Sequence, residues 1–154
     1  MKYAYLLGLL LVYIHSFSQF SITLKYKKPH CGGKHHSDTA TYFLLANQKW
    51  ILISPNNTID TVFTDIQGKV KIPNKKGKYF LYQPWKYYKT SPSDFPVILY
   101  DKQCLQENWQ IPDFTINVIS NKKYKTSPLY YTPYCPDKHP CLRKDTVIPR
   151  IPHY

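Results

Sequence analysis

Alternating apolar and polar side chains mark most of the chain as β-strand. Residues 20–27 alternate cleanly, and an apolar side chain at every second position is typical of a strand with one wet face. Residues 114–119 follow the same rule, whereas residues 49–54 are apolar on both faces, which predicts a central strand. Further strands are predicted at 41–46, 59–64, 69–73, 77–82 and 97–100.

Turn residues separate several of these strands. Asp65 can accept hydrogen bonds from backbone amides ahead of it, and Gly68 can adopt the positive φ that ends such a turn. A second turn ends at Gly77, so the strands from 59 to 82 are predicted to form two hairpins in a meander.

The strands imply a fold class and a domain plan. No stretch repeats apolar residues at helical spacing, so we predict an all-β fold, a single antiparallel β-sandwich, with residues 83–96 as a loop. Six prolines follow Tyr124, and proline removes ladder donors, so the tail is predicted to be loop or one edge strand at most. The β-sandwich domain is predicted over 19–124 and the proline-rich, cysteine-containing tail over 125–154.

The first residues have the three parts of a secretory signal. Lys2 precedes an apolar run from Ala4 to Ile14, and small residues stand at Ser16 and Ser18. The run is shorter than the roughly 20 residues that a membrane-spanning helix needs. Residues 1–18 are therefore predicted to be a signal peptide cleaved between Ser18 and Gln19, which makes the protein secreted or periplasmic and leaves it without a membrane span.

The net charge of +12 points toward acidic partners. Nearly all of the basic residues are lysines scattered along strands, which favours a solvated surface over a dedicated polyanion site. Export removes nucleic acid from reach. The expected partner is a cell-surface protein or an anionic glycan, and the sequence leaves the oligomeric state open.

The run Thr64-Asp65-Ile66-Gln67-Gly68-Lys69-Val70-Lys71-Ile72-Pro73, followed by Gly77-Lys78-Tyr79-Phe80-Leu81, resembles the carboxypeptidase regulatory-like (transthyretin-like) domain. The resemblance implies a prealbumin-like sandwich, and in that family the domain is an accessory module without catalytic residues. The chain departs from the family where the usual glycine-bearing opening strand is missing and a Cys31-Gly32-Gly33 loop stands near that position. The region after Tyr82 is poorly covered.

Four cysteines, Cys31, Cys104, Cys135 and Cys141, are the candidates for disulfide bonds in an oxidising compartment. They allow three connectivities. The preferred ones join Cys135 and Cys141 to different partners, because a bridge between these two would leave the tail untethered.

A metal site is the alternative for the same cysteines. Imidazole and thiolate are the usual ligands of zinc and copper, and they gather in two short clusters. These clusters contain His30, Cys31, His35 and His36, and Cys135, His139 and Cys141. Neither has the paired spacing of a zinc finger, so no metal or other cofactor is predicted.

The pattern favours a module that is not an enzyme. The carboxylates are few and isolated, and Asp101 and Asp113 are expected to be loop or strand-end residues. Trp85, Tyr87 and Tyr88 alternate with lysines and could stack on sugar rings, although packing at the ends of the fold is favoured. The predicted function is an exported, non-enzymatic β-sandwich module with a structural or interaction role, and the alternative is a metal-binding protein that uses the two clusters.

Overall fold

Strands dominate the chain in a computed structural model that describes residues 19–29, 41–92, 99–119, 127–135 and 138–143. The predicted signal peptide and the loop with His30, Cys31, His35 and His36 lie outside the described residues. The elements in chain order are β1 (Gln19–Lys27), β2 (Tyr42–Leu44), β3 (Lys49–Ile53), β4 (Ile59–Phe63), β5 (Lys69–Pro73), β6 (Gly77–Tyr82), α2 (Pro84–Tyr87), α3 (Lys102–Gln110), β7 (Phe114–Val118) and β8 (Leu129–Tyr131).

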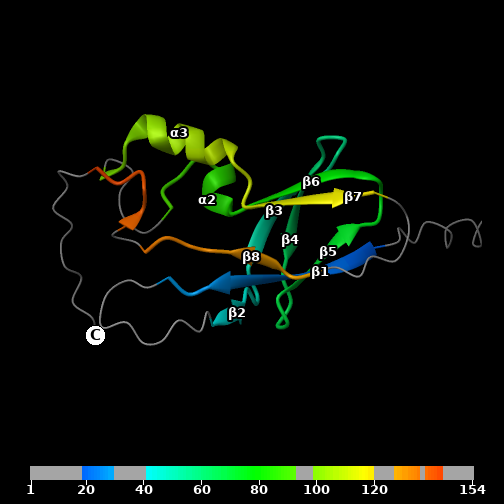
Figure 1. Cartoon of the computed structure of the whole chain (residues 1–154). Coiled ribbons are helices and arrows are strands. Elements are labelled where there is room, and N and C mark those ends of the chain that lie inside the picture. Colours follow the sequence, from blue (N-terminus) through cyan, green and yellow to red (C-terminus); the bar gives the residue numbers. More distant parts are fainter. Residues whose placement is uncertain (1–18, 30–40, 93–98, 120–126, 136–137, 144–154) are drawn as a thin grey trace, which may run out of the picture.

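The strands form two sheets, which confirms the all-β class (Figure 1). One sheet has the order β2-β1-β5 with β8 also paired to β1, and the other has the order β4-β3-β6-β7. The first half of β1 pairs with β5, and its second half pairs with β2 and β8. The β8 pairing is parallel, so the prediction of a purely antiparallel fold is wrong at this strand.

One hydrophobic core receives side chains from both sheets. Ile22 and Leu24 of β1 and Val70 and Ile72 of β5 are at most 2% exposed. They join a cluster with Trp50, Leu52, Tyr79, Leu81, Phe114, Ile116 and Val118 of the other sheet. The predicted alternation is confirmed, and β3 is confirmed as a central strand between β4 and β6. Each such burial contributes about 1.5–3 kcal/mol before entropy is counted.

The predicted meander is wrong, although its turn is correct. Asp65 Oδ1 accepts from the Gln67 and Lys69 amides at 2.8 Å each, and Gly68 has a φ of 68°. After this turn, however, β5 pairs with β1, while β4 and β6 both pair with β3. Alternation along a strand decides which face is buried but not which strand lies beside it.

Gly68 is expected to be intolerant of a side chain. A Cβ added there would lie 2.9 Å from the carbonyl oxygen of Leu24, and the backbone is left-handed. The Gly68→Ala variant should therefore lose about 1–3 kcal/mol of stability in urea denaturation. Gln67→Ala, at an exposed position of the same turn, is the control and should change the stability by less than about 0.5 kcal/mol. Equal stability of both variants would contradict this account.

Two helices replace segments that were predicted to have none. In α3, the Asp101 side chain accepts from the Cys104 amide at 2.7 Å and so caps a run of good helix formers. The run ends before Pro112, which cannot continue a helix. Only Leu105 of α3 is fully buried, so the apolar spacing that marks most helices is missing. α2 lies within the predicted loop 83–96, and the strand predicted at 97–100 is reduced to one bridge between Tyr100 and Leu142 in its described part.

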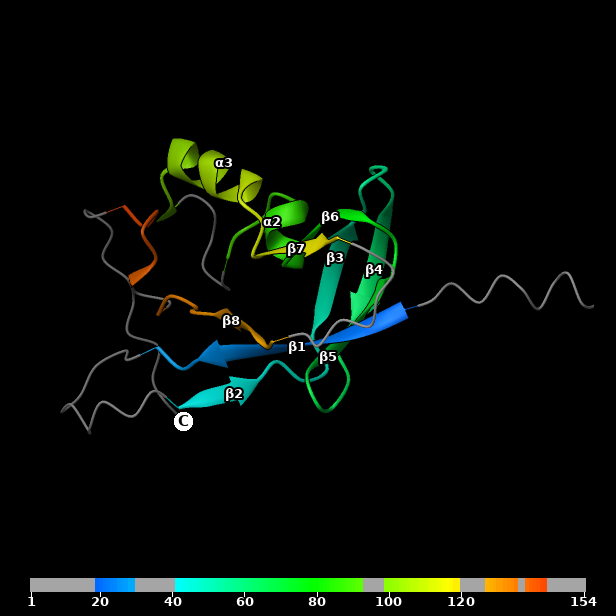
Figure 2. The same ribbon diagram turned by 45° about the vertical axis from the view of Figure 1, so that its right-hand side comes forward.

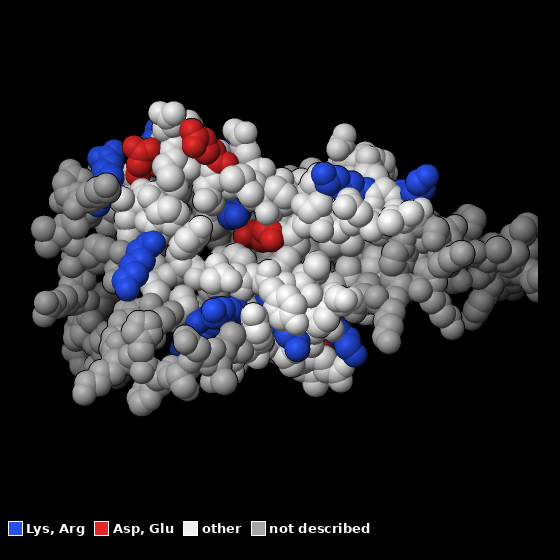
Figure 3. Space-filling view, in the orientation of Figure 1, with Lys and Arg blue, Asp and Glu red and all other residues white. Residues whose placement is uncertain are grey.

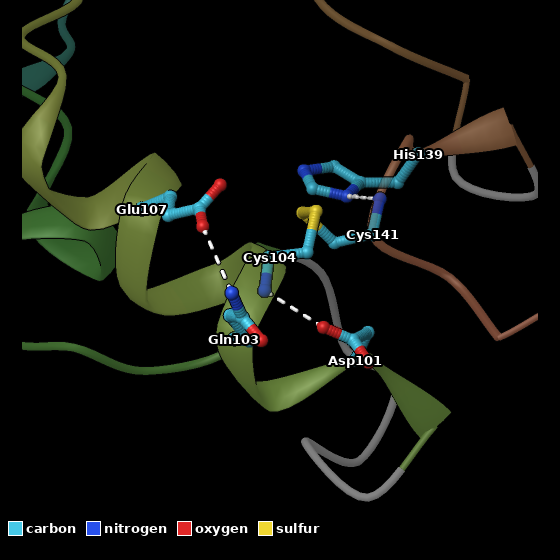
Figure 4. Close-up of a disulfide and its surroundings, with 6 residues drawn as sticks. All are labelled: Asp101, Gln103, Cys104, Glu107, His139 and Cys141. Carbon is cyan, nitrogen blue, oxygen red and sulfur yellow. Dashed lines mark hydrogen bonds between the residues drawn. A yellow bond between two sulfur atoms is a disulfide. The ribbon is translucent and has the colours of Figure 1, made fainter.

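The tail is tied to the rest of the chain by β8 and by a disulfide bond. Cys104 of α3 is bonded to Cys141 (Figure 4), and Tyr100, Leu105 and Cys141 form a second small core around the bridge. Cys135 is also disulfide-bonded. Figures 1 and 2 show α2 and α3 together on one side, with β8 running beside β1 below them.

Candidate functional site

A cavity of about 390 Å³ lies between the main core and the disulfide core. We call it the Lys86 cavity, and its walls include Trp85, Lys86, Asp113, Tyr131, Tyr134 and His139. Its volume falls in the range of about 300–1,000 Å³ that is usual for small-molecule sites. Figure 3 shows adjacent basic and acidic groups between α2 and β8 on this face of the molecule.

The ends of β6 and β7 position Asp113. Its backbone amide donates to the carbonyl of Leu81 at 2.9 Å, which extends the ladder between the two strands by one residue. Its carboxylate Oδ2 accepts from the Gln83 amide at 2.7 Å. The Asp113 side chain is 1% exposed, so its charge lies inside the protein.

The short helix α2 brings Lys86 to this carboxylate. Pro84 fits the first turn because proline has no amide hydrogen to satisfy there. Two residues later, Lys86 Nζ lies 3.0 Å from Asp113 Oδ1 and donates to the Ile111 carbonyl at 3.2 Å. It also lies 5.6 Å from the centre of the Trp85 ring, where a cation is attracted to the aromatic face.

Burial makes this ion pair costly. It raises the pKa of Asp113 above the ordinary value of 3.8, and the attraction of Lys86 opposes that rise without cancelling it. A buried ion pair is often no more stable than well-packed apolar residues of similar volume. The pair therefore adds little folding stability that apolar residues could not provide. Its position in a cavity wall favours a role in ligand binding.

His139 brings a neutral imidazole to the same cavity, with its ring centroid 6.1 Å from that of Trp85. Its Nδ1 accepts from the Cys141 amide at 3.2 Å, so the proton of the neutral ring is on Nε2. Tyr100 and Tyr134 each make edge contacts with the ring, at 5.4 Å between centroids. Burial, and then the charge of Lys86, lowers the pKa of His139 below 6.5. Figure 4 shows the ring beside the disulfide bond.

The stability of the protein is expected to depend on pH through His139. The unfolded chain binds the proton more readily, so this contribution is fully present above about pH 6.5 and is lost as the pH falls toward the lowered pKa of the folded state. Urea denaturation of the wild type and of His139→Gln, which keeps a neutral acceptor, should diverge as the pH falls below about 6.5. The wild type should lose more stability than the variant. Parallel pH curves would contradict the assignment.

Gln83 fixes two of the aromatic side chains. Trp85 Nε1 donates to the Gln83 side-chain oxygen at 2.8 Å, and the Tyr131 hydroxyl shares a hydrogen bond with the same side chain. Burial raises the pKa of Tyr131, which therefore keeps its proton. The cavity thus combines fixed aromatic faces with a cation, a carboxylate and neutral hydrogen-bonding groups.

The cysteines of the second predicted metal cluster are not available as metal ligands. Cys135 and His139 line the Lys86 cavity, but Cys135 and Cys141 are disulfide-bonded and offer no thiolate. Among the residues that the structure describes, no group of three histidine, cysteine or acidic side chains is placed to hold a metal ion.

Sequence reasoning found part of this site. Trp85 and Lys86 belong to the aromatic and lysine stretch that the sequence singled out, and they line the cavity, whereas Tyr88 of the same stretch is 55% exposed. Asp113 was expected to be a strand-end residue, and its burial and ion pair were missed. The available signal was its place directly before a strongly alternating strand, where a side chain sits at the end of the core.

No family model matches the chain, and comparisons with curated proteins and with solved structures return no match either. The resemblance to the carboxypeptidase regulatory-like domain therefore stays a prediction. No helix in the described ranges is long and apolar enough to cross a membrane.

Proposed function

We propose that the chain is an exported, non-enzymatic β-sandwich module of the prealbumin type that binds a hydroxyl-bearing unit of a glycan in the Lys86 cavity. The observation that carries the proposal is the buried Lys86–Asp113 pair, 3.0 Å apart in the wall of a cavity with aromatic sides.

The chemistry of the cavity suits a sugar ring. Lys86 keeps one of its three donors beyond Asp113 and the Ile111 carbonyl, and each Asp113 oxygen keeps a lone pair, so the pair can still bind neighbouring hydroxyls without being separated. The pair is neutral as a whole and has no net attraction for a charged ligand. The faces of Trp85 and Tyr134 can pack against the apolar face of a ring. A few polar groups among aromatic side chains are typical of small-molecule sites.

The disulfide bonds support export. Disulfides persist in oxidising compartments, and both Cys104 and Cys135 are bonded. Export would place the cavity where glycans of cell surfaces are within reach.

The hydrogen bonds within the cavity favour binding over catalysis. A general base or nucleophile must reach a substrate proton or atom. Asp113 is engaged by Lys86 and Gln83, and His139 Nδ1 is engaged by the Cys141 amide. Cys135 is disulfide-bonded and is no thiolate nucleophile.

The proposal can be tested with the mature protein on an array of neutral and acidic oligosaccharides. We expect binding by the wild type and by Lys78→Met, whose lysine lies over Phe80 outside the cavity. The double variant Lys86→Met/Asp113→Asn should stay folded and lose binding.

The indole N–H signals of the three tryptophans supply a second readout in two-dimensional NMR. A bound sugar should shift the Trp85 signal and leave that of Trp109 in place, because the Trp109 N–H donates to the Thr90 carbonyl and is not in the cavity wall. A blank array, or binding that the double variant retains, would overturn the proposed function.

A further inference from the structure

A second cavity adjoins the Lys86 cavity. It has a volume of about 410 Å³, and we call it the Trp50 cavity. Gln83, Tyr131 and Pro133 line both cavities, so the two are separated by a single wall of side chains. Gln83 and Tyr131 in that wall are hydrogen-bonded to each other. A ligand that leaves one cavity over this wall enters the other.

The two cavities differ in charge. Among the residues that the structure describes, Lys49, an exposed residue of β3, is the charged one in the wall of the Trp50 cavity, and none of the acidic ones lines it. Lys49 Nζ lies 6.0 Å from the centre of the Tyr88 ring, and the ion pair of Lys86 and Asp113 belongs to the other cavity. The Lys86 cavity offers a neutralised pair, whereas the described wall of the Trp50 cavity offers a lysine with no acidic residue beside it.

Trp50 is an aromatic residue in the wall of the Trp50 cavity. The indole Nε1 of Trp50 is buried and has no hydrogen-bond partner among the described residues. The ring itself is 2% exposed and packs against Phe114 at 5.3 Å. Because this N–H is itself out of reach of solvent, the indole can report on an occupied cavity through its ring and does not serve as a donor to a ligand.

We infer that the two cavities form one extended site for a linear acidic oligosaccharide. A hydroxyl-bearing unit occupies the Lys86 cavity, and the neighbouring unit carries a carboxylate toward Lys49 in the Trp50 cavity. This inference rests on the proposed function. It adds that the ligand has at least two units and that the second one is anionic.

A matched pair of probes tests the charge of the second unit. Oligogalacturonate carries a carboxylate on each ring, and its methyl ester is the same chain without the charge. The wild type is expected to bind the acid form about threefold more tightly in calorimetry, because a partly exposed ion pair contributes modestly. This preference should shrink as salt is raised, since screening weakens exposed pairs.

Two lysine variants separate a specific contact from general attraction. Lys49→Gln and Lys71→Gln remove the same charge, but Lys71 is an exposed residue of β5 that lines neither cavity. The preference for the acid form should be lost in Lys49→Gln and kept in Lys71→Gln. Equal losses in both variants would show nonspecific attraction and overturn the inference.

The Trp50 indole signal reports on the second cavity directly. A disaccharide or longer acid should shift the Trp50 and Trp85 signals, whereas a monosaccharide should shift that of Trp85 alone. If both lengths shift only Trp85, or if the ester binds as tightly as the acid, the extended acidic site is wrong while the proposed function stands. If no sugar shifts either signal, the proposed function itself fails.

Discussion

Replacing Lys86 alone with methionine is expected to lower the free energy of unfolding by about 3–5 kcal/mol at neutral pH. The reason is that Asp113, with a side chain that is 1% exposed, would keep a charge with no cation beside it. Urea denaturation followed by circular dichroism measures the loss. The loss should shrink as the pH is lowered, because burial already raises the pKa of Asp113 and a protonated carboxyl needs no cation.

The double variant Lys86→Met/Asp113→Asn should recover most of this loss, to within about 1 kcal/mol of the wild type. The asparagine oxygen can still accept from the Gln83 amide, so the hydrogen bond that begins α2 is retained. A double variant as unstable as the single one would contradict the ion-pair explanation. Recovery of stability together with loss of sugar binding would separate the role of the pair in binding from its effect on folding.

Removing the Cys104–Cys141 bridge is expected to destabilise the protein by about 2–4 kcal/mol. The bridge spans 37 residues and connects α3 to the tail, so the unfolded chain of Cys104→Ala/Cys141→Ala gains considerable freedom. The double substitution is preferable to a reducing agent because Cys135 is also disulfide-bonded and would be reduced at the same time.

Removing this bridge should also disturb the wall of the Lys86 cavity. His139 lies two residues from Cys141 and accepts from its amide, and Tyr100 packs against both the histidine and the disulfide core. We expect faster hydrogen exchange at the Leu105 amide of α3 and weaker sugar binding. Gln103→Ala, on the exposed side of α3, is the control and should change neither. Unchanged stability without the bridge would contradict this account.

The sequence predicted strands well because each strand carries its own signal. Alternation correctly identified the buried faces of β5, β6 and β7, including Val70 and Tyr79. The turn at Asp65 was equally local, since its hydrogen bonds reach only to Lys69. The prediction of which strands pair was wrong. Residues 69–73 carry no signal that distinguishes β1 from β4 as the neighbour of β5.

The candidate site was harder to predict because it is assembled from distant segments. Lys86, Asp113 and His139 come from α2, from the residue before β7 and from the tail. Each is an ordinary polar residue in its own stretch of sequence, and the burial that changes its chemistry depends on contacts with the other segments. α3 was missed for a similar reason: its capping aspartate was visible, but its exposed surface lacks the apolar spacing that identifies most helices.

The parallel contact between β1 and β8 sets an order for folding. Leu24, near the start of the described chain, lies opposite Leu129. Strand β1 therefore completes its pairing only after β8, the last strand described, is available. Contacts so distant in sequence slow folding. Chains truncated before residue 131 would leave β1 without this partner, so they should yield protein that is sensitive to proteases.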